Sequence, residues 1–283
     1  MNNITDLGND FILYNNNLLG KGAFSTVYMG LNMITNTKVA IKTIPIKNFK
    51  NKNKKIKKEI NILQDLNHNN ICNLIDEFKY KKNHYIVLEY CQNNLHNLIK
   101  LKFSLSEKLT KRFMIQLSDA LLYLQKKNIS HRDIKPHNIL IKNNNILKLT
   151  DFGLACAFNQ RSKMKTICGS PLYMAPEIVN DEEYNSKIDL WSSGIVMYQM
   201  LFGKTPFNAS THYELINNIN NNCVNFPPNQ LSFECIDLLS NLLIKEPQDR
   251  ITWEDFFDHP FLNEDFYNSS SSKSIPIPIK KKY

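Results

Sequence analysis

Long apolar runs are missing from this 283-residue sequence, and this absence excludes several classes of protein. No stretch approaches the roughly 20 apolar residues that a helix needs to cross a bilayer. The first ten residues are polar and lack the apolar core of a signal peptide. The six cysteines are dispersed and form no CxxC pair, which argues against a disulfide framework. We therefore expect a soluble, cytoplasmic protein with reduced thiols and no transmembrane segment.

Acidic residues are fewer than basic ones, 26 against 35, which gives a formal net charge of +9. Seven lysines fall in one run, from Lys47 to Lys58. Heavy use of Asn, Lys and Ile, whose codons are AT-rich, accounts for part of this basicity. The simpler interpretation of the run is a solvated loop and helix start. The alternative is a docking patch for an acidic partner or an anionic membrane surface. Nucleic-acid binding needs a basic face with stacking aromatic residues, and we expect no specific nucleic-acid partner.

Two short stretches carry the clearest chemistry. One reads His131-Arg132-Asp133-Ile134-Lys135-Pro136-His137-Asn138, and the other reads Asp151-Phe152-Gly153. Between them lie two apolar runs separated by an Asn-rich turn at residues 143–145. This pattern predicts a short β-hairpin with polar groups at both ends. Each tripeptide alone, HRD or DFG, would be weak support, whereas both in this order and spacing favour a functional interpretation.

The polar side chains of these stretches suit phosphoryl transfer. Asp133 can accept the proton of an attacking hydroxyl, and Lys135 can balance charge on the moving phosphoryl group. Asn138 and Asp151 can hold Mg²⁺ through oxygen ligands. The two stretches resemble the catalytic loop and the metal-binding loop of eukaryotic protein kinases. This resemblance implies an α+β, bilobal protein kinase fold, with a small β-rich N-lobe and a larger, mostly α-helical C-lobe.

The resemblance extends upstream to a glycine-rich loop and a strand-like Val39-Ala40-Ile41-Lys42. Gly20 and Gly22 let a turn lie close over phosphates, although Ser25 stands where the family has a third glycine. By itself Lys42 would be interpreted as a solvent-facing strand residue. With the glycine loop before it and Glu59 after it, a phosphate anchor is favoured, and the resemblance implies a Lys42–Glu59 ion pair.

The same resemblance implies ATP and Mg²⁺ as cofactors. The residues that it assigns to nucleotide binding form the glycine loop, the adenine pocket, the connector after residue 88 and the phosphate anchor: Leu19, Gly20, Lys21, Gly22, Ala23, Phe24, Ser25, Thr26, Val27, Ala40, Leu140, Glu89, Cys91, Lys42 and Glu59. It assigns Lys42, Asp133, Lys135, Asn138 and Asp151 to catalysis. Asp189 is expected to hold the catalytic loop, and Glu177 to pair with Arg250.

Lys135 and Ser170 match the serine/threonine class, so the expected partners are proteins with Ser or Thr acceptors. Arg132 before Asp133 implies control by phosphorylation of the activation loop, with Thr166 as the best candidate and Ser162 as a weaker one. An upstream kinase or autophosphorylation would supply the phosphate. The alternative is that Thr166 is only a polar loop residue without a regulatory role.

The domain organisation expected is a polar segment at 1–10, a kinase domain at 11–262 and a Ser-rich, basic, disordered tail at 263–283. Within the domain the N-lobe covers about 11–90 and the C-lobe about 92–262. Motif detail, above all the stretch from Cys168 to Glu177, is similar to the autophagy-initiating, Unc-like (Atg-type) kinases. A pseudokinase scaffold is the alternative function. Nuclear access and a virus-encoded protein in a host cytosol also remain open.

Overall fold

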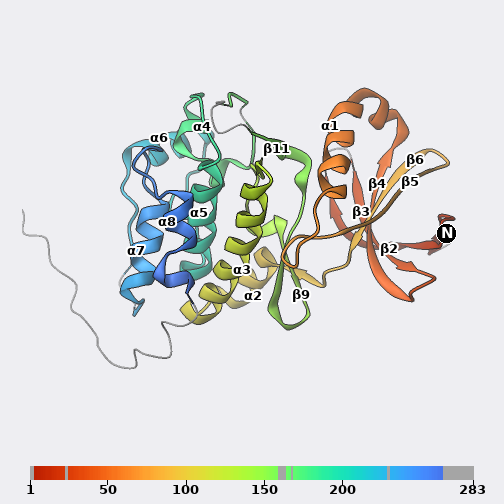
Figure 1. Cartoon of the computed structure of the whole chain (residues 1–283), viewed down its shortest axis with the longest axis horizontal. Helices are drawn as coiled ribbons and strands as arrows, with labels where there is room; N and C mark the ends of the chain where they lie inside the picture. Colours follow the sequence, from red (N-terminus) through yellow and green to blue (C-terminus); the bar gives the residue numbers. More distant parts are fainter. Residues whose placement is uncertain (1–2, 23–24, 159–163, 167, 228–229, 264–283) are drawn as a thin grey trace, which may run out of the picture.

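The computed structural model describes residues 3–22, 25–158, 164–166, 168–227 and 230–263, with the side chains of 47–55 and 144 left out. The chain forms two lobes, a β-sheet with one long helix and a larger helical lobe (Figure 1). The predicted two-lobed α+β architecture is confirmed. Among the described residues, no helix is both long and apolar enough to cross a membrane.

The small lobe is built on a six-stranded antiparallel sheet with the order β1-β2-β3-β4-β6-β5. Its strands are β1 (Ile4–Asp6), β2 (Phe11–Lys21), β3 (Thr26–Asn32), β4 (Thr37–Pro45), β5 (Leu74–Tyr80) and β6 (Asn83–Glu89). Side chains alternate between the two faces, so Val39 and Ile41 of β4 enter one apolar cluster while Ile44 enters another. Lys42 shares the face of Ile44, which is the face that α1 covers.

Helix α1 (Ile46–Gln64) begins well before Glu59, where the apolar pattern first becomes visible. Lysine is a good helix former, so the lysine-rich run continues the helix toward its N-terminus without an apolar period. Ile56 and Ile60 pack against Ile44 and Ile86 and fix the helix on the sheet. The lysines from 47 to 55 have side chains outside the described part, so the docking-patch interpretation stays a prediction.

The N-terminal segment is part of the folded sheet from residue 4. Strand β1 pairs antiparallel with β2, with Thr5 opposite Leu13. Leu7 is buried and packs in the cluster that contains Phe11 and Leu13. The sequence interpretation of 1–10 as a separate polar segment missed this strand, because three residues give too short an alternation to recognise. The tail from 264 to 283 lies outside the described residues.

The larger lobe packs its helices around α5 (Ile188–Phe202), nearly all of whose residues are buried. The other helices are α2 (Leu95–Lys102), α3 (Glu107–Lys126), α4 (Pro176–Val179), α6 (His212–Asn221), α7 (Phe233–Leu242) and α8 (Trp253–Phe257). The predicted hairpin is present as β9 (Ile139–Lys142) and β10 (Ile146–Leu149), paired antiparallel. It lies on the side of this lobe nearest the sheet (Figure 1). Short strands β7 (Asn93–Asn94), β8 (Ile129–Ser130) and β11 (Cys156–Ala157) complete the lobe.

Gly203 ends α5 in the left-handed region, with φ of +74°. A Cβ there would lie 2.0 Å from the carbonyl oxygen of Phe103, a backbone atom that cannot turn aside. We expect Gly203→Ala to lower the free energy of unfolding by about 2–4 kcal/mol, through strain and overpacking together. Chemical denaturation measures the change. Gly20→Ala is the control, because a Cβ at Gly20 meets nothing within 4 Å, and equal losses in both variants would contradict the steric argument.

Candidate active site

Asp189 fixes the loop that carries the catalytic candidates. It is buried in the first turn of α5 and accepts hydrogen bonds from Ser130 Oγ (2.8 Å) and from the backbone N–H groups of His131 (2.8 Å) and Arg132 (2.9 Å). Burial raises the pKa of Asp189, and these three donors oppose the rise by stabilising the charged carboxylate. The bonds hold Arg132 at φ of +65°, which non-glycine residues rarely adopt.

Asp133 lies at the centre of a hydrogen-bonded group. Its Oδ2 accepts from Lys135 Nζ (2.7 Å) and from Asn138 Nδ2 (2.9 Å), and its Oδ1 accepts from Ser170 Oγ (2.9 Å). Lys135 Nζ also donates to Ser170 Oγ at 2.7 Å, so the lysine, the serine and the aspartate form a closed triangle. The structure therefore brings Asp133, Lys135 and Asn138 together and adds Ser170 from a segment 32 residues further along than Asn138.

Asn138 and Asp151 flank the same end of the β9–β10 hairpin. Leu149 pairs with Ile139, and the next residue, Thr150, donates its N–H to the carbonyl of Asn138 at 2.9 Å. Asn138 uses its amide nitrogen to bind Asp133, which leaves the amide oxygen for a cation. The Asp151 side chain is about half exposed, at 49 %. Two oxygen donors beside open space suit Mg²⁺, which prefers a few carboxylate or amide ligands completed by phosphate and water.

Lys42 of β4 forms an ion pair with α1 and lies near the carboxylate of Asp151, which follows the β9–β10 hairpin. Its Nζ lies 2.5 Å from Glu59 Oε1 and 3.8 Å from Asp151 Oδ1. Burial alone would lower the pKa of Lys42, but the negative charges of Glu59 and Asp151 outweigh it, and the pKa stands above its ordinary value. Lys42 is therefore protonated and carries a positive charge. It forms the ion pair with Glu59 that the family resemblance implied.

The apolar contact behind this group joins the two lobes. The ring of Phe152 meets that of His131 edge to face, with centroids 4.9 Å apart, and both are buried. Leu63 of α1 belongs to the same core cluster, and Leu74 of β5 packs against it. Phe152 thereby fixes Asp151 between the sheet and the larger lobe.

The remaining nucleotide-binding candidates surround the space beside Lys42. Gly20 and Lys21 end β2, opposite Val27 and Thr26 of β3, and the N–H of Gly22 donates to Ser25 O at 2.8 Å. A Cβ at Gly20 would meet open space, so the fold itself does not require glycine there, whereas close approach of a phosphate would. Ala40 of β4 lies opposite Leu88 of β6. Ala23 and Phe24 lie outside the described residues.

A family model described as a protein kinase domain matches residues 13–262. The chain belongs to the protein kinase domain family. Three similar proteins carry serine/threonine-protein kinase names. R517/R518 of Acanthamoeba polyphaga mimivirus is 42 % identical, over 86 % of this chain and 61 % of its own. ATG1c of Arabidopsis thaliana is 40 % identical over 87 % and 35 %, and unc-51 of Caenorhabditis elegans is 38 % identical over 93 % and 32 %.

This chain therefore spans less than two thirds of the length of each of these relatives. The identities to ATG1c and unc-51 confirm the predicted resemblance to the Unc-like, Atg-type group. The match from residue 13 to residue 262 covers both lobes of the kinase fold.

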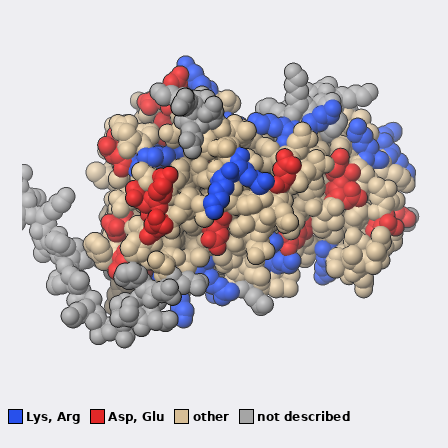
Figure 2. Space-filling model, in the orientation of Figure 1, with Lys and Arg blue, Asp and Glu red and all other residues tan. Residues whose placement is uncertain are grey.

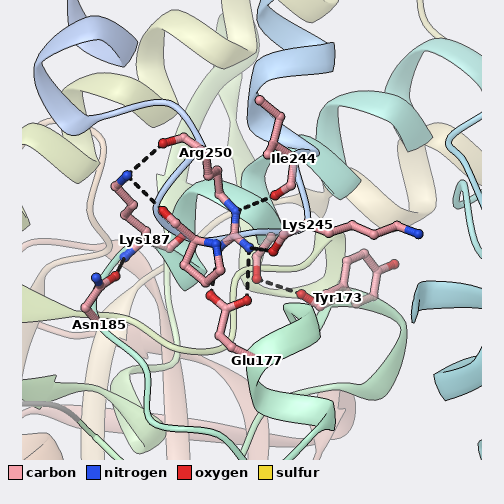
Figure 3. Close-up of polar contacts among 9 residues, drawn as sticks. Tyr173, Glu177, Asn185, Lys187, Ile244, Lys245 and Arg250 are labelled. Atoms are coloured by element: carbon pink, nitrogen blue, oxygen red, sulfur yellow. Dashed lines mark hydrogen bonds and ion pairs between the residues drawn. The ribbon is translucent and has the colours of Figure 1, made fainter. Parts of the chain in front are cut away.

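The ion pair between Glu177 and Arg250 anchors the end of the kinase activation segment, here residues 151–177 (Figure 3). Arg250 donates to both carboxylate oxygens, at 2.8 and 2.9 Å, and both side chains are almost fully buried. Its other donors reach the carbonyl oxygens of Ile244, Lys187 and Lys245. All five guanidinium N–H groups thus have an acceptor, as the predicted pairing requires.

Glu89 and Cys91 follow the sheet into the connector, as predicted, but the Glu89 side chain has a role that sequence analysis missed. Its carboxylate lies 2.5 Å from Lys142 Nζ and 2.8 Å from Lys148 Nζ, so it joins β6 to the hairpin. Burial would raise the pKa of Glu89, but hydrogen bonds from the two lysines lower it below its usual range. Burial also raises the pKa of the Cys91 thiol to about 11. The single lysine on each strand of an otherwise apolar hairpin was the only signal of this contact.

Thr166 is exposed, and its carbonyl oxygen and Arg132 both bind the hydroxyl of Tyr184. Between them stands Tyr184, which sequence analysis also missed because a single tyrosine in a polar loop carries no pattern. Ser162 lies outside the described residues.

Proposed function

We propose that this kinase-family chain is an active serine/threonine protein kinase, which transfers the γ-phosphoryl group of ATP to Ser or Thr hydroxyls of protein substrates. The observation that carries the proposal is the closed triangle of Asp133, Lys135 and Ser170, beside the formed Lys42–Glu59 pair. A pseudokinase scaffold commonly lacks one of Lys42, Asp133, Asn138 and Asp151, and this chain has all four. The serine/threonine names of its relatives point the same way.

In the mechanism that follows, Asp133 orients the substrate hydroxyl and accepts its proton. The hydroxyl would bind the Asp133 carboxylate beside Ser170 Oγ. Lys135, already 2.7 Å from Asp133, stabilises charge on the transferred group from one side, and Lys42 holds the nucleotide phosphates from the other. Mg²⁺, held by Asn138 and Asp151, would neutralise phosphate charge. Catalysis by this chain is then mainly positioning and electrostatics.

Replacing Lys42 tests the nucleotide half of this proposal. We expect Lys42→Met to lower kcat/KM for phosphoryl transfer about 10²-fold, because a buried cation aimed at the phosphates is lost. Lys38→Met is the matched control, since Lys38 is an exposed lysine of the same strand. The measurement is transfer from labelled ATP to a serine peptide. Equal activity of the two variants would contradict the assignment of Lys42.

Thr166 is the proposed site of activating phosphorylation, by an upstream kinase or by the chain itself. A phosphate adds about −1.5 to −2 charge and would pair with Arg132, which directly precedes Asp133 in the sequence. We expect mass spectrometry of active protein to find phosphate on Thr166, and Thr166→Ala to reduce peptide phosphorylation about tenfold. Full activity of Thr166→Ala protein, with no phosphate on the wild type, would remove the switch.

The proposed compartment is the cytoplasm. The structure pairs none of the six cysteines with another, which suits a reducing environment.

A further inference from the structure

Tyr184 of the loop between α4 and α5 binds the activation segment at two positions. Its backbone forms an antiparallel bridge with Met164, in which Met164 N–H donates to Tyr184 O (2.8 Å) and Tyr184 N–H donates to Met164 O (3.0 Å). Its hydroxyl donates to the carbonyl oxygen of Thr166 at 2.7 Å. Because Tyr184 is only 3 % exposed, this hydroxyl is held in place rather than free to turn into water.

The same hydroxyl is also bound by the catalytic loop. Arg132 Nη1 donates to Tyr184 Oη at 3.2 Å, and Arg132 Nε donates to the carbonyl oxygen of Leu154 at 2.7 Å. A continuous chain of hydrogen bonds therefore runs from Arg132 through Tyr184 to Thr166. Gly169, with φ of +112°, packs so closely that a Cβ there would lie 2.9 Å from Arg132 O, so the segment and the loop are in direct contact on this side.

These hydrogen bonds link Arg132 and Thr166 without requiring a phosphate. A phosphate on Thr166 would give Arg132 an anion to bind, and charge-assisted hydrogen bonds are about twice as strong as neutral ones. The link through Tyr184, in which only Arg132 is charged, and the link through phosphate, in which both partners are charged, would hold the same two elements together. Loss of the Tyr184 hydroxyl should therefore lower activity less when Thr166 carries a phosphate than when it does not.

We propose that Tyr184 is a positioning residue that holds the activation segment against the catalytic loop before Thr166 is phosphorylated. The proposal rests on the proposed kinase function. It predicts basal activity for the unphosphorylated protein, in which Ser170 stays in place beside Asp133. After phosphorylation the charged link makes the tyrosine hydroxyl dispensable. Tyr184 itself touches neither nucleotide nor substrate in this account.

The kinetic test compares Tyr184→Phe in two phosphorylation states. The variant keeps the ring and the backbone bridge with Met164 but loses both hydroxyl hydrogen bonds. We expect kcat/KM for a serine peptide to fall roughly tenfold in phosphatase-treated protein, as the loss of the two hydroxyl hydrogen bonds predicts, and less than about twofold in Thr166-phosphorylated protein. Tyr198→Phe is the control, because Tyr198 also donates to a backbone carbonyl, Asn225 O, at 2.7 Å, away from the segment. An equal fall in both states, or no fall in either, would overturn the proposal.

A second readout needs no catalysis. The Lys165–Thr166 bond is a trypsin site between the two residues that Tyr184 binds, and Lys165 is exposed. In phosphatase-treated protein we expect Tyr184→Phe to speed cleavage at this bond several-fold, as read by mass spectrometry, while Tyr198→Phe leaves the rate unchanged. An unchanged cleavage rate in Tyr184→Phe would overturn the proposed role of Tyr184 even if the wild type proved to be a kinase. Faster cleavage of Tyr184→Phe, found together with a wild-type protein that shows no transfer activity, would retain the proposed role of Tyr184 and reject the proposed kinase function.

Discussion

Glu177→Ala is expected to lower the free energy of unfolding by about 3–5 kcal/mol, the usual cost of removing one partner of a buried ion pair. The variant leaves the guanidinium of Arg250 without its carboxylate, 1 % exposed and 5.2 Å from the ring of Trp191. The buried cation then keeps only its hydrogen bonds to backbone carbonyl oxygens, so its desolvation is no longer fully compensated. Chemical denaturation of the purified variant and wild type measures the difference.

Two further variants isolate the cause. Glu182→Ala removes an exposed carboxylate a few residues away and should change stability by less than about 0.5 kcal/mol. The double variant Glu177→Leu with Arg250→Met removes both charges and should recover much of the loss, because no unpaired charge stays buried. A double variant that is less stable than Glu177→Ala alone would show that packing, rather than the unpaired cation, sets the cost.

Asp133→Asn is expected to reduce phosphoryl transfer by about 10²–10⁴-fold, the range for loss of a general base. Asparagine has the same shape and can still accept one hydrogen bond, so the fold and ATP binding should be retained. What is lost is the negative charge that holds Lys135 at 2.7 Å and the basic oxygen that accepts the substrate proton. Single-turnover transfer from labelled ATP, together with a separate nucleotide-binding titration, separates the chemical step from binding.

Asp181→Asn is the matched control for this prediction. Asp181 is exposed and has φ of +58°, a conformation that asparagine adopts equally well, so neither stability nor transfer should change. If Asp133→Asn kept more than about a tenth of wild-type transfer, Asp133 would not be the base.

The sequence predicted most of the site because its motifs are local. Asp133, Lys135 and Asn138 lie within six residues, so their spacing alone places them on one loop. The hairpin that brings Asp151 back to Asn138 was visible as two apolar runs around an Asn-rich turn. Lys42 and Glu59 needed the family resemblance, since nothing in a strand or a helix pattern says that these two side chains meet.

The contacts that sequence analysis missed join distant residues without a pattern. Tyr184 meets Arg132 across 52 positions, and Glu89 meets Lys142 across 53. Each partner is an ordinary polar residue of a loop or strand end, so only tertiary packing makes them neighbours, within the larger lobe for Tyr184 and Arg132 and between β6 and the hairpin for Glu89 and Lys142. The early start of α1 was missed for a different reason. The lysine-rich first half of the helix carries no apolar period in the sequence, so only the helix propensity of lysine indicates it.

The expectation of no specific nucleic-acid partner stays a prediction. On the face shown in Figure 2, acidic side chains lie among the basic ones over both lobes, within the part of the chain drawn in colour. Among the residues drawn in colour, that face shows no groove lined continuously by Lys and Arg. The net charge of +9 is therefore not concentrated there into one binding surface.

The central claim is that this chain phosphorylates serine and threonine, and one measurement tests it most directly. Recombinant protein is incubated with labelled ATP, Mg²⁺ and an arrayed peptide library with Ser, Thr or Tyr as the single acceptor, beside Asp133→Asn protein. The account predicts label on Ser and Thr peptides, little on Tyr peptides and none with the variant. No transfer by the wild type, even with Thr166 phosphorylated, would contradict it.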